Sequence, residues 1–166
     1  MKKFKVLISI CAFLFVCILC TEVFAFPPSG STLYDGIDVS EWQGEIDWER
    51  VIDSGIRIAY IRASEGSNYI DPDAMRNYYG AKENGIKVGF YHYLTARNEA
   101  EALEQAEFFV SVVKGLDIDC RLAMDFESFG GLGTAEINSI SETFLEEVER
   151  LSGKEVIIYS DAYNAA

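Results

Sequence analysis

Two carboxylates two residues apart are the strongest chemical signal in the sequence. Asp125 and Glu127 occur in the mostly apolar run 122–127, LAMDFE. If this run is a strand, its period of two puts both carboxylates on one face and the three larger apolar side chains on the other, where helices can cover them. The two like charges repel, so one carboxyl group should keep its proton to a higher pH. Hydrolysis of a glycosidic bond needs such a pair: an acid for the leaving oxygen and a carboxylate for the positive charge on the sugar carbon.

The ends of other predicted strands carry side chains suited to the same site. We assign Glu127 as proton donor, because it lies further out on a longer side chain, and Asp125 as its electrostatic neighbour. Asp38 lies between two apolar residues and should face the same interior. Aromatic rings that stack on sugars and polar groups that bind hydroxyls complete a predicted substrate-binding set. Its members are Trp42, Glu65, Tyr91, His92, Tyr93 and Tyr159.

Three of these interpretations have alternatives. An isolated Asp-x-Glu pair more often caps a local backbone turn or faces solvent than takes part in catalysis. The side chains at the ends of the other predicted strands are what favours a catalytic role here. His92 is equally typical of a histidine held in a protein core. Glu65 can instead accept hydrogen bonds from nearby backbone N–H groups.

Five strand-like runs alternate with helical segments along the chain. Helix N-caps are expected at Asp47 and Asn98, and a helix start at Asp71-Pro72. Apolar residues at steps of three and four between 137 and 151 predict a helix whose glutamates form a solvated acidic face. Near-continuous apolar strands joined by helices predict an α/β fold, either a barrel or an open doubly wound sheet. The predicted strands are 36–40, 56–64, 87–94, 121–127 and 155–160.

Composition narrows the function classes. A chain of 166 residues with 49% hydrophobic and 25% charged residues is expected to form one globular domain or part of one. Its net charge of −13 argues against nucleic acid as a partner. A single histidine argues against a histidine-built metal site, and no glycine-rich phosphate loop follows the first strand. We therefore expect neither a metal nor an organic cofactor.

The first 25 residues resemble a secretory signal peptide. Three lysines precede the apolar run 6–20, and Ala25 ends a cleavage-site pattern of small residues. We expect a signal peptide at 1–25, a linker at 26–34 and a domain at 35–166, with the product secreted or associated with the cell wall and free of the membrane after cleavage. A retained membrane anchor and a lipoprotein attached through Cys20 are the alternatives. After cleavage one cysteine, Cys120, remains, so no intramolecular disulfide is expected.

Five motifs in order resemble the family 25 glycoside hydrolases, the Chalaropsis-type lysozymes. They are DGIDVSEWQG at 35–44, IDW at 46–48, IRASEG at 61–66, GIKVGFYHY at 85–93 and MDFE at 124–127. The resemblance implies a muramidase that cuts the β-1,4 bond between N-acetylmuramic acid and N-acetylglucosamine in peptidoglycan glycan strands. It also implies a TIM-like modified (β/α)5β3 barrel and no cofactor, and we expect a monomer. By position, Glu127 matches the family's general acid, and Asp125 and Asp38 match its other cleft carboxylates.

One departure from the family concerns length. The family continues past the fifth strand with a further helix, more barrel strands and a late cleft aspartate, whereas this sequence stops at Ala166. We therefore expect a C-terminally incomplete barrel holding the first five strands. A catalytically inactive cell-wall-binding remnant and a chitinase-like N-acetylhexosamine hydrolase that uses the same carboxylates remain alternative functions.

Overall fold

The computed structural model describes residues 32–160. The predicted signal peptide, most of the predicted linker and the last six residues lie outside this range. Residues 34–160 lie in one compact unit of helices and strands. In chain order the elements are β1 (Gly36–Val39), the 3-10 helix η1 (Glu41–Gln43), α2 (Trp48–Asp53), β2 (Ile58–Glu65), β3 (Tyr69–Ile70), α3 (Ala74–Glu83), β4 (Lys87–Tyr93), α4 (Glu99–Val113), β5 (Leu122–Asp125), α5 (Thr134–Ser152) and β6 (Val156–Tyr159).

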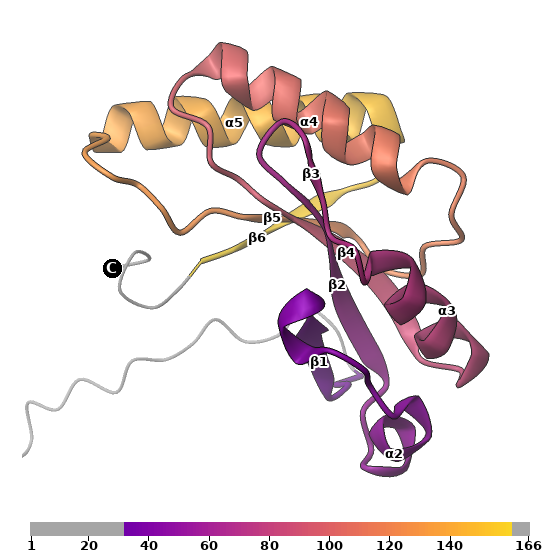
Figure 1. Cartoon of the computed structure of the whole chain (residues 1–166). Coiled ribbons are helices and arrows are strands. Elements are labelled where there is room, and N and C mark those ends of the chain that lie inside the picture. The colour runs from indigo at the N-terminus through magenta and orange to yellow at the C-terminus, as the bar shows by residue number, and fades with distance from the viewer. Residues whose placement is uncertain (1–31, 161–166) are drawn as a thin grey trace, which may run out of the picture. The chain divides into compact units, whose positions relative to one another are not determined.

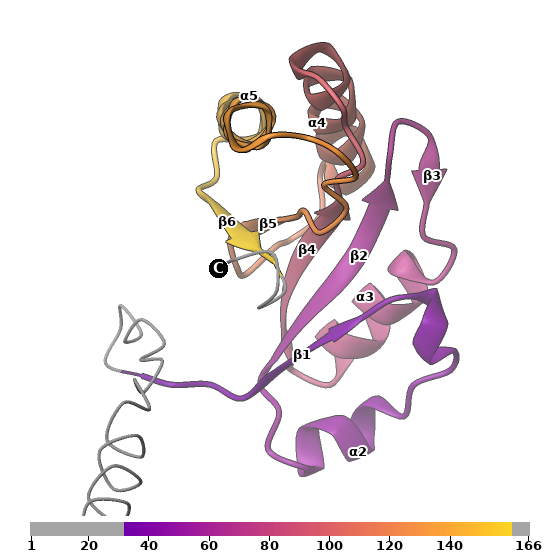
Figure 2. The same cartoon turned by 90° about the vertical axis from the view of Figure 1, so that its left-hand side faces the viewer.

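The sheet is wound in a single direction. Its parallel strands lie in the order β1-β2-β4-β5-β6, and the short β3 pairs antiparallel with β2. Spatial order follows chain order, so the structure excludes the doubly wound alternative, in which the strand order reverses at a switch point. All the connecting helices consequently lie on one side of a curved sheet, as Figures 1 and 2 show.

The core lies between the sheet and the helices. Alternate strand residues, among them Ile61, Phe90 and Met124, are buried there against Phe109 of α4 and Phe144 of α5. Each large apolar side chain removed from water contributes about 1.5–3 kcal/mol. The interposed strand residues point to the opposite, concave side, and it is these residues that form the site described below.

The predicted strands and helix starts agree with the structure within a few residues. The side chain of Asp47 accepts a hydrogen bond from the Arg50 N–H at 3.1 Å. Asn98 accepts one from the Glu101 N–H at 3.0 Å, which caps α4. The helix expected at Asp71 begins at Ala74; Asp71 forms the turn before it, with its side chain accepting a hydrogen bond from the Asp73 N–H at 2.9 Å and its carbonyl one from the Ala74 N–H at 3.1 Å.

Among the described residues β1 and β6 each pair with one neighbour, so the sheet is open, as expected of an incomplete barrel, and the specific (β/α)5β3 barrel is not confirmed. Two other features differ from the predictions. Two short elements, η1 and β3, were not predicted. The face of α5 expected to be solvated includes Glu147, which is buried and paired with Arg150 at 2.7 Å.

Within residues 32–160 no helix is both long and apolar enough to cross a membrane.

Candidate active site

A cavity of about 360 Å³ lies on the concave side of the sheet. All five parallel strands contribute to it, and its volume is within the range of small-molecule sites. Its lining is mixed: apolar side chains and four tyrosines surround two carboxylates. The lining residues are Tyr34, Gly36, Ile37, Asp38, Ile58, Tyr60, Tyr91, Ala123, Asp125, Ile157 and Tyr159.

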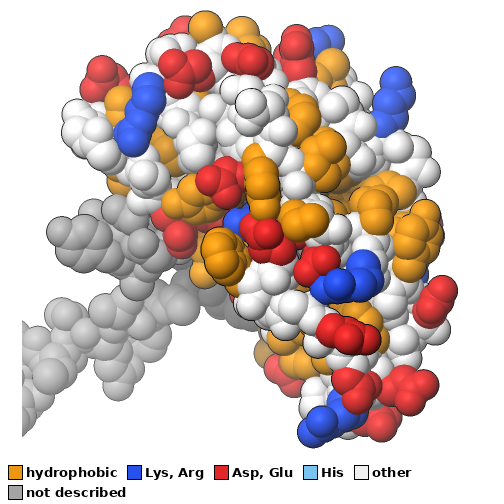
Figure 3. Space-filling view, in the orientation of Figure 1, with side chains coloured by type: hydrophobic (Ala, Val, Ile, Leu, Met, Phe, Trp, Pro, Cys, Tyr) orange, Lys and Arg blue, Asp and Glu red, His pale blue; other side chains and the backbone are white. Residues whose placement is uncertain are grey.

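Asp38 and Asp125 reach this cavity from strands far apart in the sequence. Asp38 is the third residue of β1, and Asp125 is the last residue of β5. Asp125 is buried, whereas Asp38 is exposed. Acidic and hydrophobic side chains also gather side by side near the middle of the face seen in Figure 3. The structure thus brings two of the three predicted catalytic carboxylates to one cavity.

Tyr91 of β4 lies in the field of both acids. Burial is the main cause that raises the pKa of its phenol; the charges of Asp125 and Asp38 raise it further, and Arg62 opposes them. Its neighbour Tyr60 has a pKa raised to about 12, again chiefly by burial. Both phenols are therefore neutral hydrogen-bond donors at physiological pH, which suits the hydroxyl and acetamido oxygens of a sugar.

Glu127 lies just beyond the end of β5 and does not line the cavity itself. The strand pairing continues past Asp125, because the Phe126 N–H donates to the Tyr159 carbonyl at 3.2 Å. Phe126 is buried and packs edge-on against Phe129, with ring centroids 4.9 Å apart. Glu127 is half-buried, and the period of two, continued past the end of β5, would put it on the same side as Asp125.

The remaining predicted contacts lie around the same edge. Asp125 aligns with Tyr93 on one side and with Tyr159 on the other, and Tyr93 aligns with Glu65 at the end of β2. Of these, Tyr159 lines the cavity. Trp42 lies in η1, directly after β1, and 78% of it is exposed.

His92 does not contribute to the cavity, so its predicted role in substrate binding is corrected. It is fully buried on the helix-covered side of the sheet, with its ring 5.3 Å from that of Phe144. Its Nδ1 lies 2.9 Å from Ser64 Oγ, and its Nε2 lies 3.3 Å from Gln105 Oε1. Burial lowers the His92 pKa to about 4, so the ring is neutral. Successive strand residues face opposite ways, which is why Tyr91 and His92 cannot share one cavity.

The sequence reasoning missed the inward residues of β2. Tyr60 and Arg62 alternate with buried Ile61, and the same period-two argument that singled out Asp125 would have identified them. Gly89 on the adjacent strand provides the space for Tyr60, because a Cβ there would lie 2.5 Å from Tyr60 Cε1. Within residues 32–160 no group of three or more histidine, cysteine or acidic side chains is arranged to hold a metal ion.

Comparison with known families then identifies the chain. The model of the family "Glycosyl hydrolases family 25" matches residues 37–164, from β1 to beyond β6. This chain belongs to glycosyl hydrolase family 25. The matched range includes Asp38, Asp125 and Glu127, as the motif resemblance implied.

Individual relatives agree with the family 25 assignment. The chain is 39% identical over 140 residues to the protein YegX of Escherichia coli K12, covering 81% of this chain and 50% of that protein. It is 37% identical over 125 residues to an autolytic lysozyme of Clostridium acetobutylicum, covering 75% of this chain and 37% of the relative. A bacterial lysozyme structure from Streptomyces coelicolor is 33% identical with a TM-score of 0.68, covering 79% of this chain and 64% of that one. The chain thus spans half or less of the two sequence relatives.

Proposed function

We propose that this family 25 chain is a secreted lysozyme, a 1,4-β-N-acetylmuramidase acting on the glycan strands of peptidoglycan. One observation carries the proposal: Asp38 and Asp125, from the first and fourth of the five parallel strands, face one cavity, and Glu127 follows two residues after Asp125, just beyond the end of β5. Relatives that are named lysozymes, from Clostridium acetobutylicum and Streptomyces coelicolor, support the substrate class.

In the proposed reaction each of these residues has a separate role. Glu127 donates its proton to the glycosidic oxygen as the bond to the sugar C1 breaks. Asp125 and Asp38, as carboxylates, stabilise the positive charge that develops on the sugar ring. Water supplies the hydroxyl that ends on C1, and its remaining proton restores the acid. Tyr91 and Tyr60, both neutral, donate hydrogen bonds to the bound sugar.

Replacement of Glu127 by Gln tests the assignment. Gln keeps the size of the side chain and cannot donate a proton as an acid does, so the release of reducing ends from purified peptidoglycan should fall about 10²–10⁴-fold. Glu142→Gln, at an exposed position of α5, is the matched control and should leave the rate unchanged. Equal rates for the full chain and its Glu127→Gln variant would refute the role of Glu127.

A further inference from the structure

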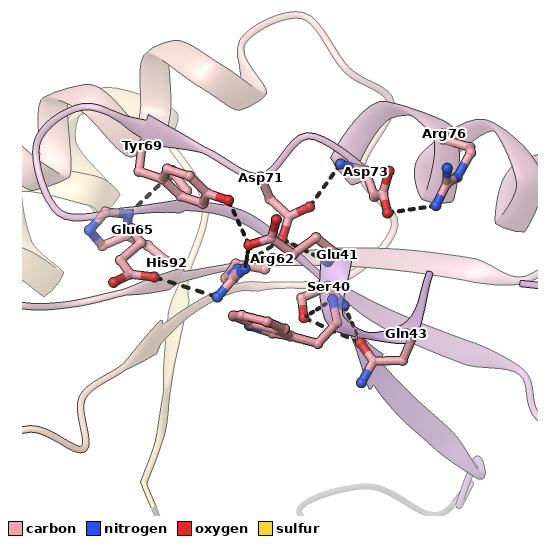
Figure 4. A network of polar contacts seen from close by, with 12 residues as sticks. Ser40, Glu41, Gln43, Arg62, Glu65, Tyr69, Asp71, Asp73, Arg76 and His92 are labelled. Atoms are coloured by element: carbon pink, nitrogen blue, oxygen red, sulfur yellow. Dashed lines mark hydrogen bonds and ion pairs between the residues drawn. The ribbon is translucent and has the colours of Figure 1, made fainter. Parts of the chain in front are cut away.

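A buried arginine beside the acid cavity gathers three carboxylates. Arg62, near the end of β2, is 7% exposed. Its guanidinium contacts Asp71 Oδ2 through Nε at 2.8 Å, Glu41 Oε1 at 2.8 Å and Glu65 Oε2 at 3.5 Å, and lies 5.8 Å from the centre of the Tyr69 ring. Figure 4 shows these side chains converging from the segment after β1, from β2, from β3 and from the turn that follows β3. We call Arg62, Glu41, Asp71 and Tyr69 the clamp.

Within the clamp, Glu41 is held at three points. Its backbone N–H donates to Asp71 Oδ2 at 3.0 Å, and its carboxylate accepts hydrogen bonds from Arg62 and, at 2.6 Å, from the Tyr69 hydroxyl. That hydrogen bond to Glu41 is the main cause that raises the pKa of Tyr69 to about 12. The phenol therefore stays protonated and continues to donate. Asp71 is itself fixed, since its backbone N–H donates to the Ala63 carbonyl at 3.1 Å.

The residue after Glu41 is the exposed Trp42. Trp42 is 78% exposed, whereas the chain's other tryptophan, Trp48, is 7% exposed in the core. A three-residue 3-10 helix has few backbone hydrogen bonds of its own. The Ser40–Gln43 capping box and the clamp on Glu41 therefore hold this turn in place. An exposed ring on a turn fixed in advance loses little conformational freedom when it binds a ligand.

We propose that the clamp is a positioning device that holds Trp42 as a stacking platform for a sugar ring at the rim of the acid cavity. The inference rests on the proposed function for the class of ligand, a sugar. The part that concerns how the clamp holds Trp42 does not depend on that function. The clamp residues act through Trp42 and do not themselves touch the sugar. Removing Arg62 would leave the buried Asp71 carboxylate without its partner and would unfold the region, so it is a poor test.

Tyr69→Phe is the sharper variant, because it removes one hydroxyl and keeps the ring beside Arg62. The full chain labelled with 5-fluorotryptophan gives two ¹⁹F resonances, which a Trp42→Phe variant assigns. Tyr69→Phe should shift or broaden the Trp42 resonance and leave that of Trp48 unchanged. Tyr79→Phe, at an exposed tyrosine of α3, is the matched control and should change neither.

Binding of a soluble probe, the β-1,4-linked N-acetylglucosamine tetramer, completes the test. Titration should shift the Trp42 resonance, and Tyr69→Phe should raise the Kd about 3- to 10-fold with the melting temperature nearly unchanged. The double variant with Tyr69→Phe and Trp42→Ala should have the same Kd as the Trp42→Ala single variant, because the clamp acts through Trp42.

An unchanged Trp42 resonance in Tyr69→Phe, no response of Trp42 to the probe, or fully additive effects in the double variant would each overturn the clamp. If the probe binds as expected while the chain releases no reducing ends from peptidoglycan, the proposed function fails and the clamp stands.

Discussion

Tyr91 and His92 are neighbours in sequence with opposite environments. Tyr91 faces the acid cavity, whereas His92 lies in the core between Ser64 and Gln105. The residue types at this strand end suggested a sugar site for both, and the sequence did favour a core histidine equally. Adjacent strand residues face opposite sides of the sheet, so once Tyr91 is assigned to the cavity side, His92 must face the helices. Asp38 and Asp125 were placed correctly because that rule was applied to them.

The buried histidine predicts a pH-dependent stability. Its pKa of about 4 in the folded state is below the ordinary 6.5, so the unfolded chain binds the proton more readily between these values. Stability therefore falls as the pH is lowered through this window, by about 2 kcal/mol between pH 7 and pH 5. Urea unfolding at the two pH values measures it.

The chain has one histidine, which makes the control simple. A His92→Gln variant should be less stable at pH 7 and should show little change between pH 7 and pH 5. The lowered pKa values of Asp119 and Glu147 matter only at lower pH, because carboxylates lose such stabilisation below about pH 4. A wild-type free energy of unfolding that is the same at pH 7 and pH 5 would contradict the account.

Among the elements, the strands and helices with a clear period were predictable and the short ones were not. The five parallel strands carry several consecutive apolar residues, and the helices carry caps at Asp47 and Asn98. By contrast η1 and β3 have three and two residues, too few for any period. Tertiary contacts to Arg62 hold them, and a sequence pattern does not report such contacts. This is why the clamp escaped the sequence reasoning although Glu65, one of the carboxylates on Arg62, was singled out.

Gly80 of α3 lies against Trp48 of α2, and this contact predicts the effect of adding one methyl group at position 80. A Cβ at Gly80 would lie 2.3 Å from Trp48 Cδ1, whose ring is buried. Ala is favoured over Gly in a helix by about 1 kcal/mol, whereas overpacking a core costs about 1–3 kcal/mol. Because a buried indole has little room to move, overpacking should dominate, and Gly80→Ala should lower the free energy of unfolding by about 1 kcal/mol.

A double-mutant cycle checks that cause. Trp48→Phe removes part of the ring and should be destabilising alone, but in that background Gly80→Ala should become neutral or stabilising. Urea denaturation of the four proteins gives the coupling. An equal loss from Gly80→Ala in both backgrounds would show that the contact with Trp48 is not responsible.

For the molecule as a whole, the α/β class and the side of the sheet that carries the site followed from the sequence. The order of strands resolved the choice between barrel-like and doubly wound sheets, which strand patterns alone leave open. A barrel closes only when its first and last strands pair, and these strands are far apart in the sequence. The local pattern of apolar residues does not predict that pairing. In residues 32–160 the result is an open arc whose concave side holds the cavity.

The net charge of −13 predicts an unusual salt response. Peptidoglycan is commonly anionic, so charge should repel the chain from this proposed substrate at low salt. Raising the ionic strength from about 10 mM to about 150 mM shortens the screening length from about 30 Å to about 8 Å. The rate on cell walls should therefore rise, while the Kd for a neutral N-acetylglucosamine oligomer should not change. A steep fall on cell walls would contradict this.

The identity of the new reducing end tests the central claim most directly. Purified peptidoglycan is digested with the full chain, the products are reduced with borohydride, and the terminal amino sugar alcohols are identified by mass spectrometry. Cleavage as a muramidase, with Glu127 as the acid, predicts N-acetylmuramitol as the new terminus and its near absence with the Glu127→Gln variant. New termini of N-acetylglucosaminitol, or muramitol formed equally by the variant, would contradict the account.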